Sequence, residues 1–405
     1  MIVEKIVMMN DKNKILILPS WYATPEAPTS GSFFREQAEL MLPEYDVRVL
    51  VASKRWISPR RYFYEKHFKP YKRVVSEYFV NTPPTYHFEY DFIKAFPDER
   101  NLEIELNDYA DVLLGYFKNE LNWTPDLIHA HSTLQGGIIA QYLSEKLQIP
   151  YCITEHMNPF VLHKYSDFWK TRIVGALEKA TAVLAVSNHQ KQHILMNEID
   201  CRPIAVGNLV NENIFKIERN QPQQFTVVFV NYYPNFIKDV HTFFEALAMM
   251  KDEIYSIIVG GGELNGEYQS NIFEHLADRY GVKDYVEIIP KASRTEMNEI
   301  YNRSHALVST SIAESFGVAI CEAMLCGNPV VVTANGGCSE YMIEGKNGYV
   351  VPLKNVQALA EKILLLKKNY SNFDSQYIRN HIVEDYGRQT FKNRISNIYN
   401  GLIFK

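Results

Sequence analysis

The sequence contains few cysteines, and their arrangement excludes two kinds of protein. There are five of them, an odd number, in 405 residues, and none belongs to a Cys-x-x-Cys pair. A small domain held together by disulfides would need a denser framework, and a structural zinc site would need paired ligands at short spacing. We therefore expect reduced thiols and a cytoplasmic protein.

The sequence also lacks a charge excess and a long apolar run. A net charge of −5 leaves no overall basic excess of the kind that binding along a nucleic-acid backbone needs. No apolar run approaches the ~20 residues of a membrane-spanning helix. The first residues, MIVEKIVMMNDKNK, carry charges inside their short apolar piece and do not resemble a signal peptide. We expect no nucleic-acid partner and, at most, peripheral contact with a membrane.

Several motifs of phosphate and metal chemistry are absent. There is no Asp-x-Asp at a strand end, no cluster of His, Cys and Asp at metal-ligand spacing, and no P-loop Gly-Lys-Ser/Thr. The glycine-rich turn VGGGE at 259–263 lacks the full G-x-G-x-x-G pattern. These absences argue against an NTPase and a dinucleotide oxidoreductase, and we expect neither a metal nor another cofactor.

Both halves of the chain alternate short β-branched strands with helical patterns. The first half has KILILPSWY (14–22), FFREQAELMLPEY (33–45) and DVRVLVAS (46–53). The second has FTVVFVNYYP (225–234), KDVHTFFEALAMM (238–250), YSIIVGGG (255–262) and a helix expected near 266–280. This order predicts an α/β protein with parallel sheets covered on both faces, which bind ligands at the carboxyl ends of their strands.

The polar connector at 206–224, rich in Asn and Gln, marks the predicted domain boundary. We predict a first domain over 1–207, a second over 208–385, and a closing helix over 386–405 that packs on either domain, with the first as the favoured partner. The chain length agrees with two domains of ordinary size.

The stretch ESFGVAICE, Glu314 to Glu322, places two acids around a segment of small and apolar residues. It follows a predicted strand, HALVSTSIA, so that a helix beginning near Phe316 or Gly317 has its N-terminus at the strand's carboxyl end. Such an N-terminus binds phosphates, and a flanking carboxylate on each side accepts hydrogen bonds from sugar hydroxyls. Alternatively, Glu314 only complements the helix dipole and Glu322 is a surface residue. The spacing alone does not decide.

The residues around Glu314 and Glu322 say more about their role than the spacing does. ESFGVAICEAMLCGNPVV followed by GGCSE resembles the donor-binding signature of family 4 glycosyltransferases, retaining enzymes of the GT-B fold whose two Rossmann-like domains face a cleft. PSWYATPEAPTSGSFFREQAELM is similar to the first loop and helix of that family. DLIHAHSTLQGGIIA, IPYCITEHMNPF and AVLAVSNHQKQHIL are similar to later segments of the first domain. The linker VGNLVNENIF matches loosely, because Leu209 and Asn211 replace the usual Gly and Asp.

The resemblance implies a role for each matching residue. Glu314 would contact hydroxyls of the donor sugar, Glu322 would contact the ribose, and backbone amides from Ser315 to Gly317 would face the diphosphate. Gly31 would start a helix beside the donor phosphates. The catalytic candidates are then His156, Glu314 and Lys238, and the donor-binding candidates are Gly31, Tyr232, Gly261, Lys291, Ser315, Phe316, Gly317 and Glu322.

The histidines have two interpretations. By resemblance, His156 in TEHMNPF would lie against the sugar near the acceptor, whereas the alternative is a core histidine bonded to a backbone carbonyl. For His129 we favour the structural interpretation, and His131 is left open. Gly261 and Lys291, in VGGGE and IPKAS, would lie on the nucleotide side of the cleft.

One departure from the family pattern concerns positive charge. The family usually has a Gly-Arg-Leu segment and a Lys six residues after its Arg, both touching the diphosphate. In VNYYPNFIKDVH, Lys238 occupies the Lys position but Tyr232 occupies the Arg position. A charge-assisted hydrogen bond of ~1.5–3 kcal/mol would be missing. Lys291, Arg294 or Arg35 could supply it; otherwise the chain is a slow enzyme or has lost activity.

The resemblance further implies metal-independent transfer of a hexosyl group from a nucleotide sugar, with retention. In that mechanism the departing phosphate takes the acceptor proton, and neither acid is a nucleophile, unlike the carboxylates of glycoside hydrolases. The first domain would hold a glycan or lipid-linked acceptor in cell-envelope polysaccharide synthesis. Residues 54–73 carry eight Lys or Arg, one Glu and six aromatics. They fit an anionic membrane surface, or alternatively a solvated face over an aromatic cluster.

Two other functions remain open at this point. A nucleotide-sugar epimerase would bind the same diphosphate without an acceptor, and a non-catalytic or weakly active sugar-nucleotide-binding protein is favoured only by Tyr232. The identity of the sugar, the nucleotide, the acceptor and the linkage cannot be read from hydroxyl- and phosphate-binding motifs that many donors share.

Overall fold

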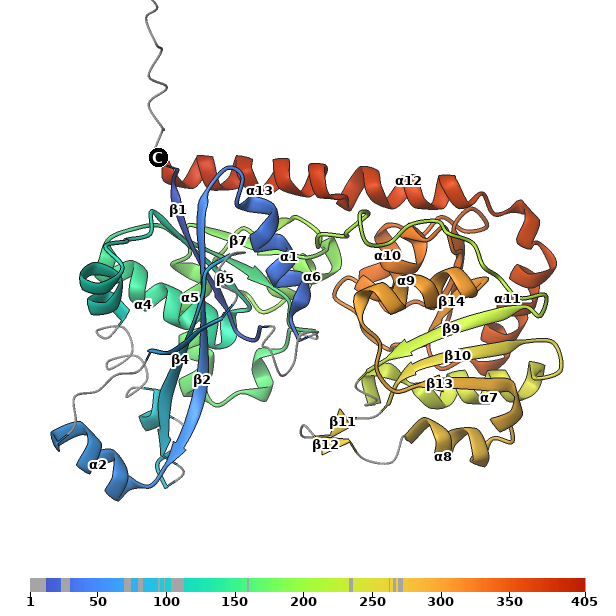
Figure 1. Ribbon diagram of the computed structural model, residues 1–405, viewed down its shortest axis with the longest axis horizontal. Coiled ribbons are helices and arrows are strands. Elements are labelled where there is room, and N and C mark those ends of the chain that lie inside the picture. The colour runs from blue at the N-terminus through green and yellow to red at the C-terminus, as the bar shows by residue number, and fades with distance from the viewer. Residues whose placement is uncertain are drawn as a thin grey trace, which may run out of the picture.

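The chain folds into two α/β lobes joined along one side by a pair of consecutive helices (Figure 1). In this computed structural model the described residues are 12–22, 30–68, 74–78, 83–93, 95–97, 99–102, 113–158, 160–232, 236–261, 263–264, 267–268 and 272–404. Residues 23–29 of the first loop, 69–73 of the basic segment and 262 of the glycine-rich turn lie outside them.

The first lobe is built on a sheet with strand order β3-β4-β2-β1-β5-β6-β7-β8. Its strands are parallel, except that β3 runs antiparallel to β4. The strands are β1 Lys14–Pro19, β2 Asp46–Ile57, β3 Val74–Tyr78, β4 Thr85–Ile93, β5 Leu127–His131, β6 Tyr151–Glu155, β7 Ala182–Ala185 and β8 Ile204–Ala205. The helices are α1 Ser32–Met41, α2 Pro59–Phe68, α4 Ile138–Leu147, α5 Asp167–Glu178 and α6 Asn188–Leu195.

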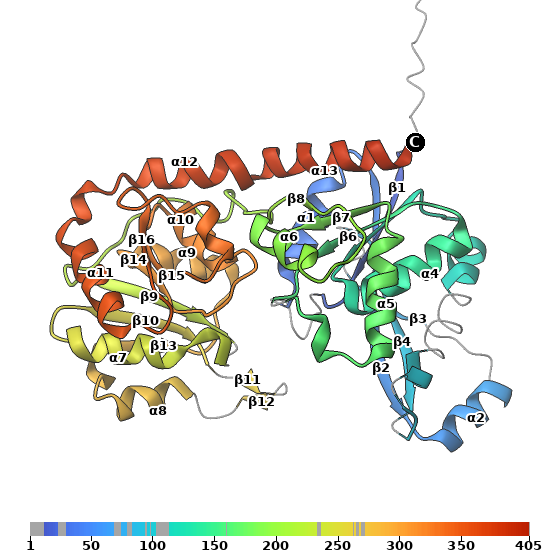
Figure 2. The same ribbon diagram turned by 180° about the vertical axis from the view of Figure 1, so that it is seen from behind.

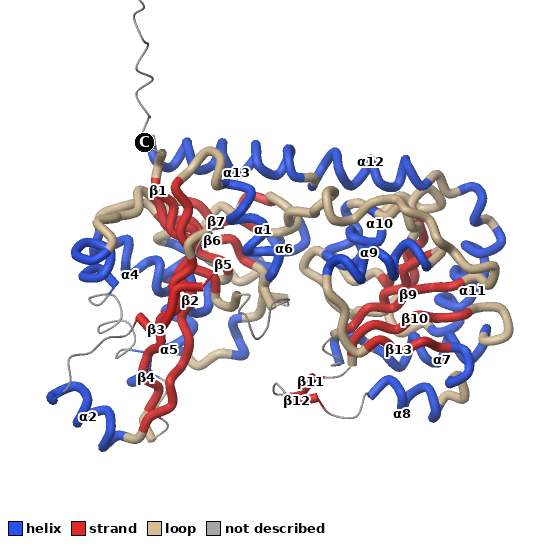
Figure 3. Tube along the Cα trace, viewed as in Figure 1, coloured by secondary structure: helices blue, strands red, loops and turns tan. Residues whose placement is uncertain are grey.

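Side-chain alternation along β1 explains why both faces of this sheet are covered. Ile15 and Ile17 pack into one core with α1, whereas Leu16 and Leu18 pack into the other core with α4 and α5. Successive residues of a strand point to opposite faces, so the apolar run of β1 supplies both cores. Figure 3 shows the strands of this lobe between its helices.

The second lobe has a parallel sheet with strand order β13-β10-β9-β14-β15-β16. Its strands are β9 Thr226–Asn231, β10 Tyr255–Gly260, β13 Val286–Ile289, β14 Ala306–Ser309, β15 Val330–Thr333 and β16 Gly348–Val351, with a separate pair β11 Glu263–Leu264 and β12 Glu267–Tyr268. Its helices are α7 Val240–Met250, α8 Ile272–Arg279, α9 Arg294–Arg303, α10 Val318–Leu325 and α11 Val356–Lys368. The predicted pair of doubly wound parallel-sheet domains is confirmed.

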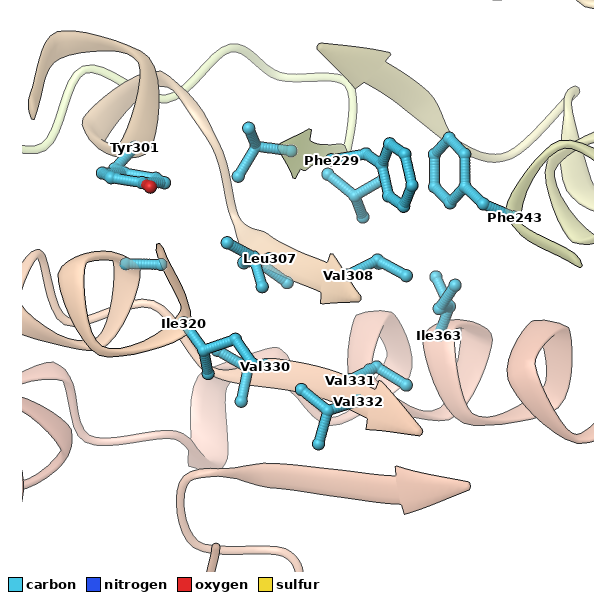
Figure 4. Packing of buried hydrophobic residues seen from close by; sticks show 14 of the residues in the cluster. Phe229, Phe243, Tyr301, Leu307, Val308, Ile320, Val330, Val331, Val332 and Ile363 are labelled. Carbon is cyan, nitrogen blue, oxygen red and sulfur yellow. The ribbon is translucent and has the colours of Figure 1, made fainter. Parts of the chain in front are cut away.

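The core of the second lobe is a continuous layer of branched and aromatic side chains between its sheet and helices. Figure 4 shows the rings of Phe229 on β9 and Phe243 on α7 face to face, and their centroids are 4.1 Å apart. Val308 of β14 and Val331 of β15 are also fully buried. This packing fixes the strand ends from which the site is built.

The last two helices, α12 Ser375–Tyr386 and α13 Arg388–Ile403, cross from the second lobe to the first (Figure 2). Helix α12 packs on α10 and α13 packs on α1. Phe391, Ile395 and Tyr399 of α13 are buried in the same core as β1. Lys392 pairs with Glu44 at 2.6 Å. The carboxyl end of the chain is therefore an integral part of the first lobe's core.

The order of strands places two topological switch points opposite each other. In the first sheet β1 lies between β2 and β5, and in the second β9 lies between β10 and β14. Loops leave such a point in opposite directions and open a crevice at the carboxyl ends of the strands. Among the described helices, none is long and apolar enough to cross a membrane.

Candidate active site

A cavity of about 280 Å3 lies between the carboxyl ends of the two sheets. The first lobe contributes Trp21, Phe33 and His156, and the connector contributes Asn208. Facing them, the second lobe contributes the ends of β9 and β14, the loop from 311 to 317 and the start of α10. The first lobe's wall is thus aromatic, and the facing wall sets a few polar and charged groups among apolar side chains, as expected for a small-molecule site between domains.

The start of α10 is shaped by Gly317, which has a left-handed backbone with φ of 88°. A Cβ at this position would lie 2.8 Å from the Tyr341 hydroxyl oxygen, so a larger residue does not fit without movement. No side chain caps the helix. Because Ser315, Phe316 and Gly317 all line the cavity, the positive end of the helix faces it.

Glu314 enters the cavity from a loop that is tied to the neighbouring strand connection. Its backbone N–H donates to the Asn335 carbonyl at 3.1 Å, and the Gly337 N–H donates to the Glu314 carbonyl at 3.0 Å. Lys238 pairs with Glu314 Oε1 at 2.5 Å. Thr310 Oγ1 donates to the Lys238 carbonyl at 3.1 Å and holds the backbone of that lysine beside β14. The structure therefore brings an acid and a cation together at the cavity wall.

Glu322 is the fifth residue of α10, little more than one turn from its start, and it is 7% exposed. Its Oε2 accepts a hydrogen bond from the Tyr301 hydroxyl at 3.1 Å, and its Oε1 is paired with Arg294. Burial raises the pKa of Glu322. The carboxylate predicted to meet the ribose is thus already held by protein groups.

Arg294 was named from the sequence only as a substitute for the missing arginine. In the structure its guanidinium also pairs with Glu36 of α1, at 2.9 Å to Oε1, so that it joins the two lobes. The role of Glu36 was missed. The one local signal for it is an acid among the buried positions of the first helix, because the partner is far away in sequence.

Tyr232 directly follows β9, and its hydroxyl donates to the Ala292 carbonyl at 3.3 Å. Burial raises the pKa of Tyr232 to about 12, so the side chain is neutral at physiological pH. It therefore ties β9 to the loop before α9 and supplies no positive charge. Lys291, the neighbour of Ala292 in that loop, is exposed.

The histidines form a buried row in the first lobe. His131 Nδ1 and His156 Nε2 are 3.1 Å apart. His129 is bonded through both ring nitrogens, to the Tyr399 hydroxyl at 2.6 Å and to Thr154 Oγ1 at 2.7 Å. Burial lowers the pKa of His156 to about 3, which keeps its ring neutral where it borders the cavity. His129 thus has the structural role favoured from the sequence, because two hydroxyl groups hold its ring.

Glu155, which sequence reasoning missed, fixes the loop that carries His156. It is fully buried, and its Oε1 accepts from the backbone N–H groups of His156 at 2.8 Å and Met157 at 2.7 Å. Its Oε2 accepts from Thr133 N at 2.9 Å and Thr133 Oγ1 at 2.5 Å. Four donors satisfy this carboxylate, so it acts as an internal brace for the cavity wall.

Two glycines of the predicted donor site adopt left-handed backbones. Gly31 precedes α1 with φ of 60°, and a Cβ there would lie 3.0 Å from the Trp21 carbonyl oxygen. Gly261 follows β10 with φ of 84°. Both lie at carboxyl ends of strands or in the loops that follow them.

The predicted residues thus fall into two groups. Those that line the cavity are His156, Lys238, Glu314, Ser315, Phe316 and Gly317. Among the described residues, those outside the cavity lining are Gly31, Tyr232, Gly261, Lys291 and Glu322. Trp21 and Phe33 line it without having been singled out, although both belong to the segment quoted for the first loop. No group of three or more described His, Cys, Asp or Glu side chains could hold a metal ion.

Comparisons with known proteins agree with this arrangement. Residues 210–384 match the family model of glycosyl transferases group 1, and residues 111–206 match the model of glycosyltransferase family 4. The chain is 27% identical over 245 residues to an uncharacterized glycosyltransferase of Methanocaldococcus jannaschii, covering 60% of this chain and 66% of that one. It is 26% identical over 365 residues to the putative teichuronic acid biosynthesis glycosyltransferase TuaC of Bacillus subtilis, covering 86% and 88%.

Solved structures show the same fold. Sucrose-phosphate synthase from Thermosynechococcus elongatus superimposes with a TM-score of 0.76 at 18% identity, covering 96% of this chain and 99% of that one. HepE of Anabaena, solved in complex with UDP-glucose, gives 0.70 at 19% identity, covering 96% and 100%. Neither an epimerase nor a non-catalytic binding protein is favoured by these matches. The two matched models, one in each lobe, mark this protein as a glycosyltransferase of the family 4 type, and the solved structures show its GT-B fold.

Proposed function

We propose that the protein is a retaining, metal-independent hexosyltransferase that uses a nucleotide-diphosphate sugar. The observation that carries this proposal is the cavity in which His156 faces the Lys238–Glu314 pair and the start of α10. A helix N-terminus and an ammonium group suit a diphosphate, and a carboxylate beside them suits sugar hydroxyls. HepE, which shares the fold, was solved with UDP-glucose.

In the proposed reaction the bond between the anomeric carbon and the diphosphate oxygen breaks as the acceptor oxygen bonds to the same face of that carbon. The acceptor proton passes to the departing phosphate. Lys238 and the α10 N-terminus stabilise the negative charge that develops on the leaving group. The neutral ring of His156 offers a hydrogen bond to a sugar hydroxyl and no charge. Glu314 orients the sugar and does not attack it.

The donor half of the proposal is tested by nucleotide release from UDP-, GDP- and ADP-sugars, with and without acceptor, and by which nucleotide raises the melting temperature. We expect Glu322→Ala to weaken nucleotide binding more than Glu314→Ala, and Glu314→Ala to slow turnover more. Glu361→Ala on the exposed side of α11 is the control. The reverse order of effects would contradict the assignment. Activity that disappears in EDTA and returns with a divalent ion would contradict metal independence.

We infer that the acceptor is a glycan or a lipid-linked sugar used in cell-envelope polysaccharide synthesis at the cytoplasmic face of the membrane. TuaC is named for teichuronic acid biosynthesis and matches most of this chain. The five cysteines are free thiols, which suits a reducing compartment. Transfer of radiolabelled sugar to lipid extracts and to soluble glycans separates the two acceptor classes.

The surface that would meet the membrane is at the far end of the first lobe, where α2 projects away from the second lobe (Figure 1). Trp56, Phe63 and Tyr64 are 60%, 49% and 56% exposed. Part of the positive charge here is neutralised, because Arg55 and Arg61 both pair with Glu65. Exposed rings among cations favour the headgroup region of an anionic bilayer.

Sedimentation with phosphatidylglycerol vesicles at low salt tests this surface. We expect Phe63→Ala to reduce binding, whereas Phe404→Ala, which removes an exposed ring at the other end of the chain, should not. If the unmodified protein does not sediment with these vesicles, the membrane contact is wrong while the donor chemistry is unaffected.

A further inference from the structure

A buried polar cluster beside the site is centred on Arg294, the first residue of α9. Its Nη2 lies 2.9 Å from Oε1 and 3.0 Å from Oε2 of Glu36, and its Nη1 pairs with Glu322. Glu36 belongs to the first lobe, and the other two residues belong to the second. One guanidinium therefore joins acids from both sides of the site.

Both acids of the cluster have a second hydrogen-bond partner, and an aromatic ring lies beside the guanidinium. Asn211 of the connector donates to Glu36 Oε2 at 2.9 Å, and Tyr301 donates to Glu322 Oε2 at 3.1 Å. The guanidinium carbon lies 4.9 Å from the centre of the Phe215 ring. Glu36 and Glu322 are 6% and 7% exposed. These contacts come from α1, the connector, α9 and α10, all of which converge beside the cavity.

The cluster connects directly to the elements that shape the cavity. Helix α1, which carries Glu36, begins after Gly31 and contributes Phe33 to the aromatic wall. Helix α10, which carries Glu322, begins at the facing wall, which the second lobe forms. Tyr232, which occupies the place of the missing arginine, is bonded to the residue two positions before Arg294. Because its charge is taken up by two carboxylates, Arg294 is not a free phosphate ligand.

A cluster with two buried acids and one cation is not explained by stability alone. Desolvation of buried ions offsets most of their attraction, and one negative charge remains in excess here. Its geometric consequence is clear, however. While the three side chains are joined, the start of α10 and the start of α1 are held at a fixed separation across the cavity.

Resting on the proposed function, we propose that Arg294 is a positioning residue: it clasps Glu322, the ribose-binding acid, to Glu36 of the opposite lobe. The clasp couples recognition of the donor nucleotide to alignment of the two lobes. The cavity of about 280 Å3 is at the lower limit of the ~300–1,000 Å3 usual for ligand sites. In this proposal the lobes part to admit a nucleotide sugar and then realign. Arg294 thereby acts on the reaction through other residues, without touching the phosphates.

Glu36→Gln is the sharpest test, because it opens the clasp without harming the donor side. The Arg294–Glu322 pair remains, and the cluster loses its excess negative charge, so the variant should fold. We expect the ligand-free variant to have a larger radius of gyration in solution scattering and faster proteolysis in the connector. We expect kcat to fall about tenfold, with the donor KM within about threefold, because alignment and not donor affinity is lost.

Substitutions at Arg294 and a matched ion pair provide the controls. Arg294→Lys keeps the charge but not the two-sided geometry, so its kcat should fall between those of the wild type and Arg294→Met. Arg294→Met should also weaken binding of the free nucleotide, because Glu322 loses its partner. Glu287→Gln breaks an ion pair with Arg303. Arg303 is on α9, as Arg294 is, but both partners of this pair belong to the second lobe. Glu287→Gln should change neither scattering nor kcat.

Each arm can overturn the proposal. Unchanged scattering in Glu36→Gln would show that the clasp does not hold the lobes. Altered scattering with unchanged kcat would show that alignment is not coupled to turnover, and an equal response of Glu287→Gln would show that any lost ion pair has the same effect. A wild type that releases no nucleotide from any donor would contradict the proposed function, whereas the scattering arm, which needs no substrate, would still decide the clasp.

Discussion

Acidification should destabilise the first lobe through its buried histidines. Burial lowers the pKa of His129 and of His156 to about 3, compared with 6.5 for an unperturbed histidine, and lowers the pKa of His131 in the same direction. The folded state therefore binds fewer protons than the unfolded state between about pH 3 and pH 6.5. Stability contributed by these neutral rings is present above pH 6.5 and is lost as the pH falls below that value.

The magnitude follows from the two pKa values. At pH 5 the unfolded histidine is almost fully protonated and the folded one is not, so each of His129 and His156 lowers the free energy of unfolding by about 2 kcal/mol relative to pH 7.5. Together they account for about 4 kcal/mol, with His131 adding to it. A typical domain has about 5–15 kcal/mol in total, so the loss is a large share of its stability.

Urea unfolding at pH 7.5 and pH 5.0, followed by circular dichroism, measures this effect. His156→Gln removes one titrating ring, and its loss of stability between the two pH values should be about 2 kcal/mol smaller than that of the wild type. Carboxylates titrate alike in both proteins and cancel in the comparison. If His156→Gln shows the same pH dependence as the wild type, then His156 is not a buried neutral ring and its proposed role as a neutral hydrogen-bond partner is wrong.

Three further changes probe the cavity walls. Lys238→Met should lower kcat by about 10²-fold in steady-state kinetics, since the leaving group loses a cation, and an unchanged kcat would contradict that role. Gly317→Ala should lower the free energy of unfolding by about 1–3 kcal/mol in urea titrations through backbone strain and contact with Tyr341. Gly345 is also left-handed, but a Cβ there would meet no other heavy atom within 4 Å, so Gly345→Ala should lower the free energy of unfolding by less. Equal losses in the two variants would mean that the contact with Tyr341 is irrelevant. Trp21→Ala should raise the acceptor KM and leave the donor KM unchanged, whereas the opposite split would place Trp21 on the donor side.

Much of the fold could be predicted because its signals are local. The β-branched run at 14–19 and the apolar spacing at 33–41 define a strand and a helix whatever the rest of the chain does. Gly31 and Gly317 both stand immediately before helices, as expected from glycines that adopt φ values unfavourable for other residues. The helix expected near 266–280 is observed over Ile272–Arg279. The part of the cavity wall formed by Glu314, Ser315, Phe316 and Gly317 could be predicted because it is one continuous segment.

The remaining parts of the site depend on pairs of residues that sequence spacing does not reveal. Arg294 and Glu36 are 258 positions apart, and the ring pair His131 and His156 lies at the ends of the adjacent strands β5 and β6, with His156 directly after β6. Whether such residues meet depends on strand order and on how the lobes pack. Trp21 illustrates the same point. The local sequence does not say whether a tryptophan after a strand lies on the surface or lines a cavity, because that depends on the second lobe, which forms the opposite wall.

The sequence by itself determined the class of the fold, the alternation of helices and strands, and the loop that begins with Glu314. These features depend on the spacing of apolar residues and on the backbone freedom of glycine, which involve only a few neighbouring residues. Only the tertiary structure decided that neutral Tyr232 donates a hydrogen bond to the loop before α9, that Glu322 is paired with Arg294, and that the last helix packs into the first lobe's core. Those outcomes depend on burial and on charges brought together from distant segments. The free energy of such contacts is set by the folded surroundings rather than by neighbours along the chain.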